Sequence, residues 1–196
     1  MLHIVYGGSA SGKSSYAESF AMSLQGEGRL LYIATMYPYK WNTTEIDPET
    51  MQRIERHRAM RADKGFDTVE CYRRVEHIVA KRQDVLLLEC MSNLLANEMY
   101  LEPDSNAGSD MAETMSPVSN KIVQALIDLS TRVQELVIVT NDVFSDGGSL
   151  TYDESTREYV KNLAEINCAL ARVAETVTEV VCGIPVIVKK NHPMGK

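Results

Sequence analysis

Short runs of consecutive apolar residues alternate with longer amphipathic stretches along this chain of 196 residues. Near-continuous apolar runs of this length are typical of strands in a parallel sheet that is buried on both faces. Apolar residues spaced by three and four predict helices instead. The expected strands cover residues 2–6, 29–35, 85–89 and 136–140, and the expected helices cover residues 15–25, 48–62, 72–81, 117–133 and 154–176.

This alternation predicts an α/β fold, a mostly parallel sheet flanked by helices, in a single domain over residues 1–196. Near the C-terminus, residues 179–182 and 186–189 are expected to form a hairpin at the sheet edge, where Pro185 is tolerated in the turn. The polar, aperiodic segment 101–116 is expected to be a mobile surface loop. Ligands of such folds bind at the carboxyl ends of the strands.

The most specific motif begins where the first expected strand ends. Residues 7–14 read Gly7-Gly8-Ser9-Ala10-Ser11-Gly12-Lys13-Ser14, a complete G-x-x-x-x-G-K-[ST] phosphate-binding loop between a strand and a helix. Backbone N–H groups of such a loop, with the positive end of the next helix, bind phosphate oxygens. Lys13 is the candidate for the outer phosphates and Ser14 for Mg²⁺. The alternative is a glycine-rich turn, but the complete motif predicts a P-loop NTPase-like fold that binds a nucleoside triphosphate.

The expected helix 48–62 carries a basic face. Asp47 is a suitable N-cap for it, and Pro48 suits its first position. Spacing of four places Arg53, His57 and Arg61 on one side, where positive neighbours would disfavour the imidazolium form and leave His57 a neutral nucleophile. The arginines could hold an anionic phosphate chain against it. Taken alone, this segment favours a solvated basic helix with an incidental histidine.

Glu89 ends the third expected strand, where phosphate-loop proteins place the acid that supports Mg²⁺. The alternative is a strand that simply ends in a polar residue. Asn141 and Asp142 follow the next strand, but Thr140-Asn141-Asp142 is not the N-K-x-D motif that reads guanine.

Composition narrows the class of partners. The net charge of -7 argues against general affinity for nucleic acid, which needs a basic surface. Four widely spaced cysteines, at 71, 90, 168 and 182, are expected to be reduced and mostly buried thiols. Neither a signal peptide nor a window apolar enough for a membrane span is apparent, so a cytoplasmic protein is expected.

A set of short segments occurs in one order along nearly the whole chain. They are Gly7-Gly8-x-x-Ser11-Gly12-Lys13-Ser14, Tyr32-Ile33-Ala34-Thr35, Arg53-Ile54-x-x-His57-Arg58, Thr68-Val69-Glu70, Leu87-Leu88-Glu89-Cys90, Val139-Thr140-Asn141 and Gly183-Ile184-Pro185. In this the chain resembles the bifunctional adenosylcobinamide kinase/adenosylcobinamide-phosphate guanylyltransferase family of cobalamin biosynthesis. The Arg-Ile-x-x-His-Arg element is far more selective than the phosphate loop, which many families share.

The resemblance implies two reactions. The hydroxyl of adenosylcobinamide, a corrinoid, takes the γ-phosphoryl group of ATP or GTP; a histidine then attacks the α-phosphorus of GTP, and the corrinoid phosphate takes GMP from it. His57 matches the nucleophilic histidine. Nucleotide contacts are implied for the loop 7–14, for Thr35, Met36 and Tyr37, for Arg58, Ala59, Met60 and Arg61, for Glu70 and for Glu89. The resemblance also implies a homotrimer.

Departures from the family pattern bear on the kinase step. Ala10 stands where the family often has arginine, and Asp142 replaces a glutamate. Residues 37–47 and 101–116 are longer than expected. Two other readings stay open: another small-molecule P-loop kinase, which needs no histidine nucleophile, and a nucleotide-gated interaction protein. No clear arginine-bearing lid of such a kinase is apparent, and the interaction protein gives the Arg53-to-Arg61 element no role.

Overall fold

The computed structural model describes residues 1–101, 117–142 and 152–191. Its strands are β1 (Leu2–Gly7), β2 (Leu30–Ala34), β3 (Phe66–Glu70), β4 (Val85–Leu88), β5 (Glu135–Asn141), β6 (Thr176–Val181) and β7 (Ile184–Lys190). Its helices are α1 (Lys13–Leu24), α2 (Pro48–Arg61), α3 (Met91–Tyr100), α4 (Val118–Arg132) and α5 (Glu154–Val173), with a single 3-10 turn, η1 (Val75–His77).

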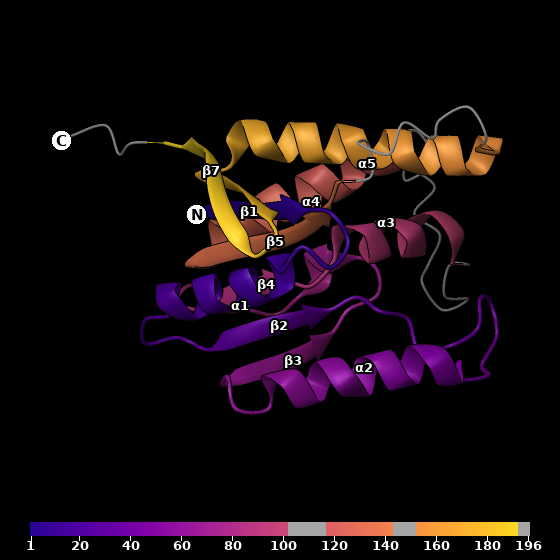
Figure 1. The fold of residues 1–196 in the computed structure, drawn as a ribbon, viewed down its shortest axis with the longest axis horizontal. Helices are drawn as coiled ribbons and strands as arrows, with labels where there is room; N and C mark the ends of the chain where they lie inside the picture. Colours follow the sequence, from indigo (N-terminus) through magenta and orange to yellow (C-terminus); the bar gives the residue numbers. More distant parts are fainter. Residues whose placement is uncertain (102–116, 143–151, 192–196) are drawn as a thin grey trace.

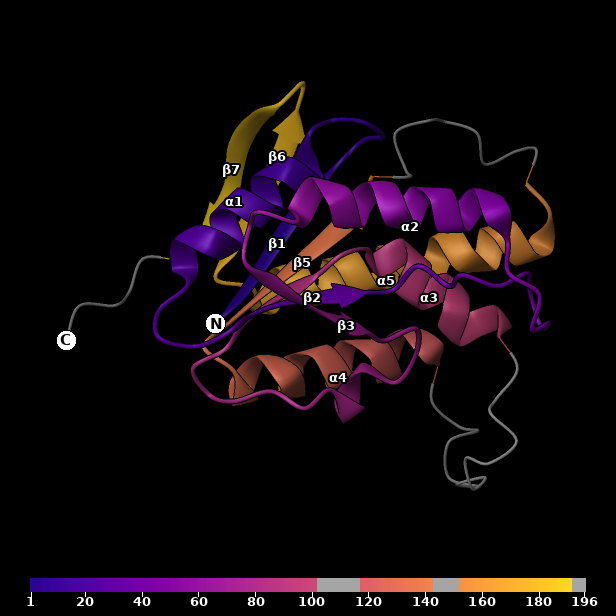
Figure 2. The ribbon, with the colours of Figure 1, turned by 90° about the horizontal axis from the view of Figure 1, so that it is seen from below.

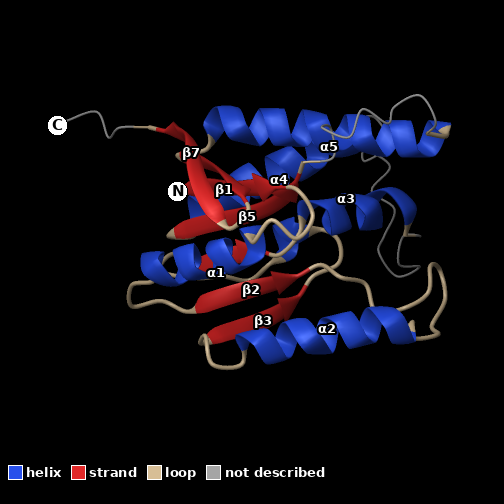
Figure 3. Cartoon of the chain, viewed as in Figure 1, coloured by secondary structure: helices blue, strands red, loops and turns tan. Residues whose placement is uncertain are grey.

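One seven-stranded sheet runs through the molecule in the order β3-β2-β4-β5-β1-β6-β7 (Figure 3). Every neighbouring pair is parallel except β6 and β7, which form an antiparallel hairpin at the edge. The parallel order brings the carboxyl ends of β1 to β6 to one edge of the sheet. The predicted α/β fold with a C-terminal edge hairpin is therefore confirmed.

Helices cover both faces of the sheet (Figures 1 and 2). The larger core joins one face to α3, α4 and α5 through residues such as Leu95, Leu126 and Ile166, all at 0% exposure. The smaller core joins the other face to α1 through Ala17 and Ala21. Helix α2 lies on the α1 side, beside β2 and β3, and Arg61 is its one buried residue. Because α2 buries so little, its inner face is open to form a site.

The expected helix over 72–81 is wrong. Only Val75–His77 are helical, as one 3-10 turn, and Arg74 before them has a left-handed backbone with φ 55°. The apolar spacing that predicted a helix belongs to Val75 and Ile78, which are both buried and anchor this connection between β3 and β4. The sequence reading also missed β3, a polar edge strand without a continuous apolar run, and α3, which follows β4 almost directly.

The hairpin turn also differs from the expectation. Cys182 and Gly183 form it with φ of 50° and 80°, as in the two-residue turns that match strand twist. Pro185 lies within β7, opposite Val180, where an edge strand tolerates the missing N–H. All four thiols are free, but Cys168 and Cys182 are exposed, so the expectation of mostly buried thiols fails for them.

The structure does not test the predicted loop 101–116 or the predicted single domain. Residues 102–116 are not among the described residues, which leaves the predicted loop 101–116 untested. The single-domain organisation stays a prediction. No helix in the described ranges combines the length and the apolar character that crossing a membrane requires.

Candidate nucleotide and group-transfer site

The phosphate loop bridges the end of β1 and the start of α1. Gly12 caps α1 with φ 91°, a conformation that favours glycine. A Cβ on Gly7 would lie 2.5 Å from the carbonyl oxygen of Val180, so this position also requires glycine. Lys13 Nζ donates to the carbonyl oxygen of Gly8 at 3.0 Å, which folds the side chain back across the loop. Burial lowers the pKa of Lys13, although nearby Cys90 opposes the shift.

Two neighbouring elements hold the loop in place. The Gly183 amide at the hairpin tip donates to the carbonyl oxygen of Ser11 at 2.8 Å, and the Asp142 amide after β5 donates to that of Gly7 at 3.2 Å. The Ser11 hydroxyl is buried and has no hydrogen-bond partner among the described residues. The β6–β7 hairpin thus supports the loop from the side, a role that the sequence motif did not indicate.

A separate small pocket of about 20 Å³ lies under the inner face of α2. Its lining comes from α2 and from the ends of β2, β3 and β4: Ala34, Met36, Ile54, His57, Arg58, Arg61, Glu70, Tyr72 and Glu89. Asp47 caps α2 as expected, accepting from the Thr50 amide at 3.3 Å, and Pro48 begins it. The chain therefore places a histidine, two arginines and two carboxylates around one hollow.

His57 faces a carboxylate that the sequence reading did not place beside it. Its Nδ1 lies 3.8 Å from Glu89 Oε1, within ion-pair range but longer than a hydrogen bond. Burial raises the pKa of Glu89, while the charges of His57 and Arg61 and a hydrogen bond from Tyr32 oppose that rise. The sequence indicated the positive neighbours of His57 on α2, and the structure adds a negative one, because Glu89 comes from the end of β4.

Arg61 is the most buried charged residue of this pocket, at 6% exposure. Its guanidinium carbon lies 3.4 Å from the centre of the Tyr32 ring, which gives a cation–π contact. Its Nη1 is buried and has no hydrogen-bond partner within the described ranges. A buried guanidinium N–H without an acceptor is costly, and a phosphate oxygen in the pocket would satisfy it.

Arg58 reaches the pocket from its rim. Its Nη2 donates to Glu70 Oε1 at 2.5 Å, and Tyr72 Oη donates to the other oxygen of Glu70 at 2.9 Å. Both members of the ion pair are about half exposed, so it contributes little to stability. Its value lies in fixing the orientation of two pocket residues.

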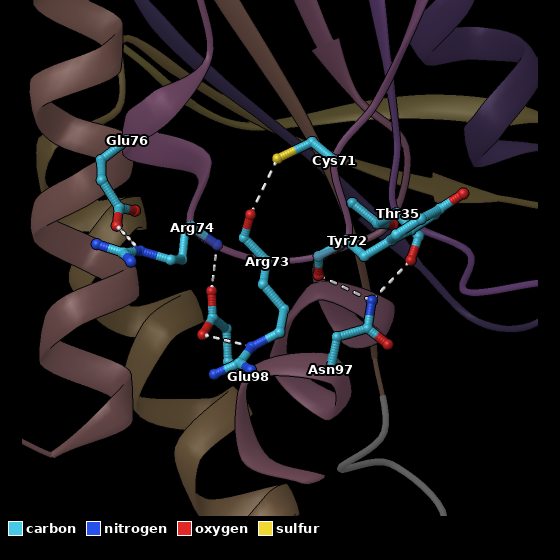
Figure 4. A network of polar contacts seen from close by, with 8 residues as sticks. All are labelled: Thr35, Cys71, Tyr72, Arg73, Arg74, Glu76, Asn97 and Glu98. Carbon is cyan, nitrogen blue, oxygen red and sulfur yellow. Dashed lines mark hydrogen bonds and ion pairs between the residues drawn. The ribbon is translucent and has the colours of Figure 1, made fainter. Parts of the chain in front are cut away.

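A polar network behind the pocket holds its loops against α3 (Figure 4). The buried Asn97 amide donates to the carbonyl oxygens of Thr35 at 2.8 Å and Tyr72 at 2.9 Å, tying the segment after β2 to the segment after β3. Glu98 accepts from the Arg74 amide at 2.5 Å and from Arg73 Nε at 3.4 Å. No pattern in the sequence indicated Asn97 or Glu98, because the helix α3 that carries them was itself not predicted.

Several candidate residues meet in the His57 pocket, and others do not. Those that line it are Met36, His57, Arg58, Arg61, Glu70 and Glu89. Ala59 and Met60 lie on the exposed side of α2, with Met60 at 63% exposure, and Arg53 is also exposed. Thr35 is fully buried and donates to the Cys90 carbonyl oxygen at 3.1 Å, as a structural residue would. Tyr37 lines a neighbouring cavity.

The loop 7–14 lies at the same sheet edge but contributes no residue to the lining of the His57 pocket. Two contacts relate the two regions. Lys64, just after α2, forms an ion pair with the buried Glu18 of α1. Cys90, next to Glu89, acts electrostatically on Lys13 of the loop. The C-terminal end of α2 thus lies beside the middle of α1, and Glu89 and Cys90 connect the region of His57 with that of Lys13.

The side chains near the phosphate loop include a few that could bind Mg²⁺. In the described part of the chain, no group of three or more His, Cys, Asp or Glu side chains could hold a metal. Magnesium usually takes one or two protein ligands and completes its shell with phosphate oxygens and water. The Ser14 hydroxyl on the first turn of α1 and the Glu89 carboxylate fit such a partial donor set.

A complete phosphate loop after the first strand of a mostly parallel sheet defines a P-loop nucleotide-binding protein. The family model described as cobinamide kinase / cobinamide phosphate guanyltransferase matches residues 3–188, and the chain belongs to this family.

Two curated relatives agree with that assignment. The chain is 30% identical over 198 residues to the bifunctional adenosylcobalamin biosynthesis protein CobU of Escherichia coli K12, covering 96% of this chain and 100% of the relative. It is 30% identical over 197 residues to the protein of the same name from Salmonella typhimurium LT2, with the same coverage. Among solved structures, an ATPase domain is similar with a TM-score of 0.44 and 12% identity, over 91% of this chain and 68% of the other.

Proposed function

We propose that this protein catalyses both reactions that its family's description names. It phosphorylates the hydroxyl of adenosylcobinamide with ATP or GTP, and it transfers GMP from GTP to the resulting phosphate, giving adenosylcobinamide-GDP. Family membership supports both activities. The transfer of GMP rests on one observation, the His57 pocket. There His57 and the buried Arg61, whose guanidinium has an unsatisfied N–H, line the same hollow. A P-loop kinase with no second activity would not need a histidine in this pocket.

The transfer of GMP proceeds through His57. Its Nδ1 side faces Glu89, which leaves Nε2 as the nucleophile. Nε2 attacks the α-phosphorus of GTP, a P–N bond forms, and the bond to the β-phosphate oxygen breaks to release pyrophosphate. An oxygen of the corrinoid phosphate then attacks the same phosphorus, and the P–N bond breaks to return the imidazole. The Glu89 carboxylate stabilises the positive charge that the ring gains on attack.

Arg61 and Arg58 hold the reacting phosphates in this scheme. Arg61 offers the unsatisfied Nη1 from the pocket floor, and Arg58 offers a guanidinium at the rim once it exchanges Glu70 for phosphate. Lys13 and the loop amides bind the triphosphate for the kinase step, which needs only direct in-line transfer. Mg²⁺, held by Ser14 and Glu89, would neutralise charge on the phosphates.

The proposal also covers the oligomeric state, the partners and the location of the protein. We infer a homotrimer from the family resemblance, and the apolar side chains exposed on β7 are candidates for its interface. The charge of -7 supports small-molecule partners rather than nucleic acid. Dependence on nucleoside triphosphates supports a cytoplasmic location. Sedimentation of the purified protein tests the trimer.

The test of the proposed function compares GTP labelled at the α-phosphate with GTP labelled at the γ-phosphate, in the presence of Mg²⁺ and without corrinoid. We expect the protein to gain one GMP from the first and no label from the second. The adduct should be acid-labile and stable to alkali, as for phosphorus on imidazole nitrogen. His57→Ala should abolish it, and Arg56→Ala on the exposed side of α2 should not. Undiminished labelling of His57→Ala would refute the proposal.

A further inference from the structure

A much larger cavity adjoins the His57 pocket. Its volume is about 1170 Å³, and it is lined by residues of the segments 37–44 and 69–79 together with Leu101 at the end of α3. Glu70 and Tyr72 line both hollows, so the two share a wall. Pockets for small molecules usually measure about 300–1,000 Å³, so this cavity suits a ligand larger than a nucleotide.

The lining combines groups that suit a macrocycle with polar arms. Tyr37 and Tyr72 meet edge to face at 5.4 Å and offer aromatic surface, and Ile78, Val79 and Leu101 add apolar surface. Thr44 offers a hydroxyl group that can bond to an amide side arm, while the hydroxyl of its neighbour Thr43 donates to the Lys40 carbonyl oxygen and accepts from the Glu45 amide.

Hydrogen bonds from α3 fix the part of the cavity lining formed by residues 72–74. Figure 4 shows that Tyr72, Arg73 and Arg74 follow one another along the wall, with Asn97 and Glu98 of α3 bonded to their backbone and side chains. Cys71 donates from its thiol to the Arg73 carbonyl oxygen at 3.2 Å, and burial raises the pKa of this thiol to about 11, so it stays protonated. A pocket fixed in this way loses little conformational entropy when a ligand binds.

We propose that this cavity binds the corrin macrocycle of the acceptor substrate, with the acceptor phosphate directed past Glu70 and Tyr72 toward His57. The inference rests on the proposed function for the identity of the acceptor. A ligand seated here reaches the histidine across the shared wall, where Arg58 is the cation that its phosphate meets. The nucleotide and the corrinoid would then approach His57 from different sides, the first from the phosphate loop and the second from this cavity.

The test is direct binding of adenosylcobinamide phosphate, followed by equilibrium dialysis and read from the absorbance of the corrinoid. It is run with and without a non-hydrolysable GTP analogue. Thr44→Trp places bulk in the cavity from an exposed loop position, and Val79→Trp does the same from the opposite segment. Thr131→Trp, exposed on α4 and outside the lining, is the matched control.

We expect the dissociation constant to rise about tenfold or more in Thr44→Trp and Val79→Trp and to stay unchanged in Thr131→Trp. GMP labelling from GTP alone should remain in both cavity variants. Equal corrinoid affinity in all four proteins, or no corrinoid binding by the parent, would overturn the inference. Failure of the proposed function would show differently, as a parent protein that takes no label from GTP whatever its affinity for corrinoid.

Discussion

The phosphate loop and the His57 pocket lie at the same edge of one sheet, yet they are built in opposite ways. The loop is eight consecutive residues whose shape follows from local backbone rules, such as the positive φ of Gly12. The pocket draws its lining from residues between 34 and 89 that four elements bring together. A local motif can be read from the chain directly, whereas an assembled pocket depends on strand order and helix placement.

The phosphate loop and the His57 pocket also differ in how closely each one defines the function. Many families share the loop, so it defines the class of ligand but not the reaction. The pocket, with its histidine, buried arginine and facing carboxylate, is where we propose that the covalent intermediate forms. Substitutions in each region distinguish one shared site from two separate ones.

The largest effect is expected from Lys13→Ala. The change removes a charge-assisted contact to phosphate, and we expect kinase and GMP transfer to fall together by about 10²-fold or more, with an unchanged melting temperature. Lys161→Ala, exposed on α5, is the control. A loss confined to the kinase reaction would show that the loop and the His57 pocket serve separate nucleotides, and unchanged turnover would remove the loop from the site.

The second prediction compares two arginines on α2. Arg61 is buried in the pocket with an unsatisfied N–H, and Arg53 is exposed outside it. We expect Arg61→Ala to slow GMP labelling by about tenfold or more and Arg53→Ala by less than about twofold. Single-turnover labelling over a range of pH measures both. Equal effects would mean that α2 acts through its overall charge.

The third prediction separates the two roles offered for Glu89. If it supports Mg²⁺, Glu89→Gln should raise the Mg²⁺ concentration for half-maximal activity several-fold. If it serves only to stabilise charge on His57, labelling should slow while the Mg²⁺ dependence stays the same. Titration of Mg²⁺ with both reactions as readouts distinguishes these outcomes, and a variant equal to the parent in both would leave Glu89 as a structural strand end.

The smallest effect concerns stability. Because burial raises the pKa of Glu89, its ionisation costs the folded state free energy as pH rises through that raised pKa. The cost is absent below the ordinary carboxyl pKa, where Glu89 is protonated in both states. Glu89→Gln should therefore match or slightly exceed the parent's melting temperature at pH 7, and the difference should vanish on acidification. A variant less stable at pH 7 than at pH 4, relative to the parent, would contradict this sign.

The pattern of apolar residues was enough to predict the α/β fold, because the buried strands are continuous apolar runs, as Val85–Leu88 illustrates. It failed for β3, an edge strand in which three of the five residues are polar and exposed, and for residues 72–81, where apolar residues anchor a loop. Of the site, His57, Arg61 and Glu89 could be named in advance. Their mutual arrangement could not, because Glu89 reaches His57 only through the pairing of β2 with β4. Asn97 was missed since nothing local marks an amide that bonds to two distant carbonyl groups.

The most direct test of the account is to map the GMP adduct in the unmodified protein. The chain contains four histidines, at 3, 57, 77 and 192, so the adduct has four candidate imidazoles. After incubation with GTP and Mg²⁺, peptides prepared under alkaline conditions and sequenced by mass spectrometry should carry one GMP on His57 and none on the others. An adduct on one of the other three histidines or on a residue other than histidine would contradict the central claim that the α2 pocket holds the nucleophile.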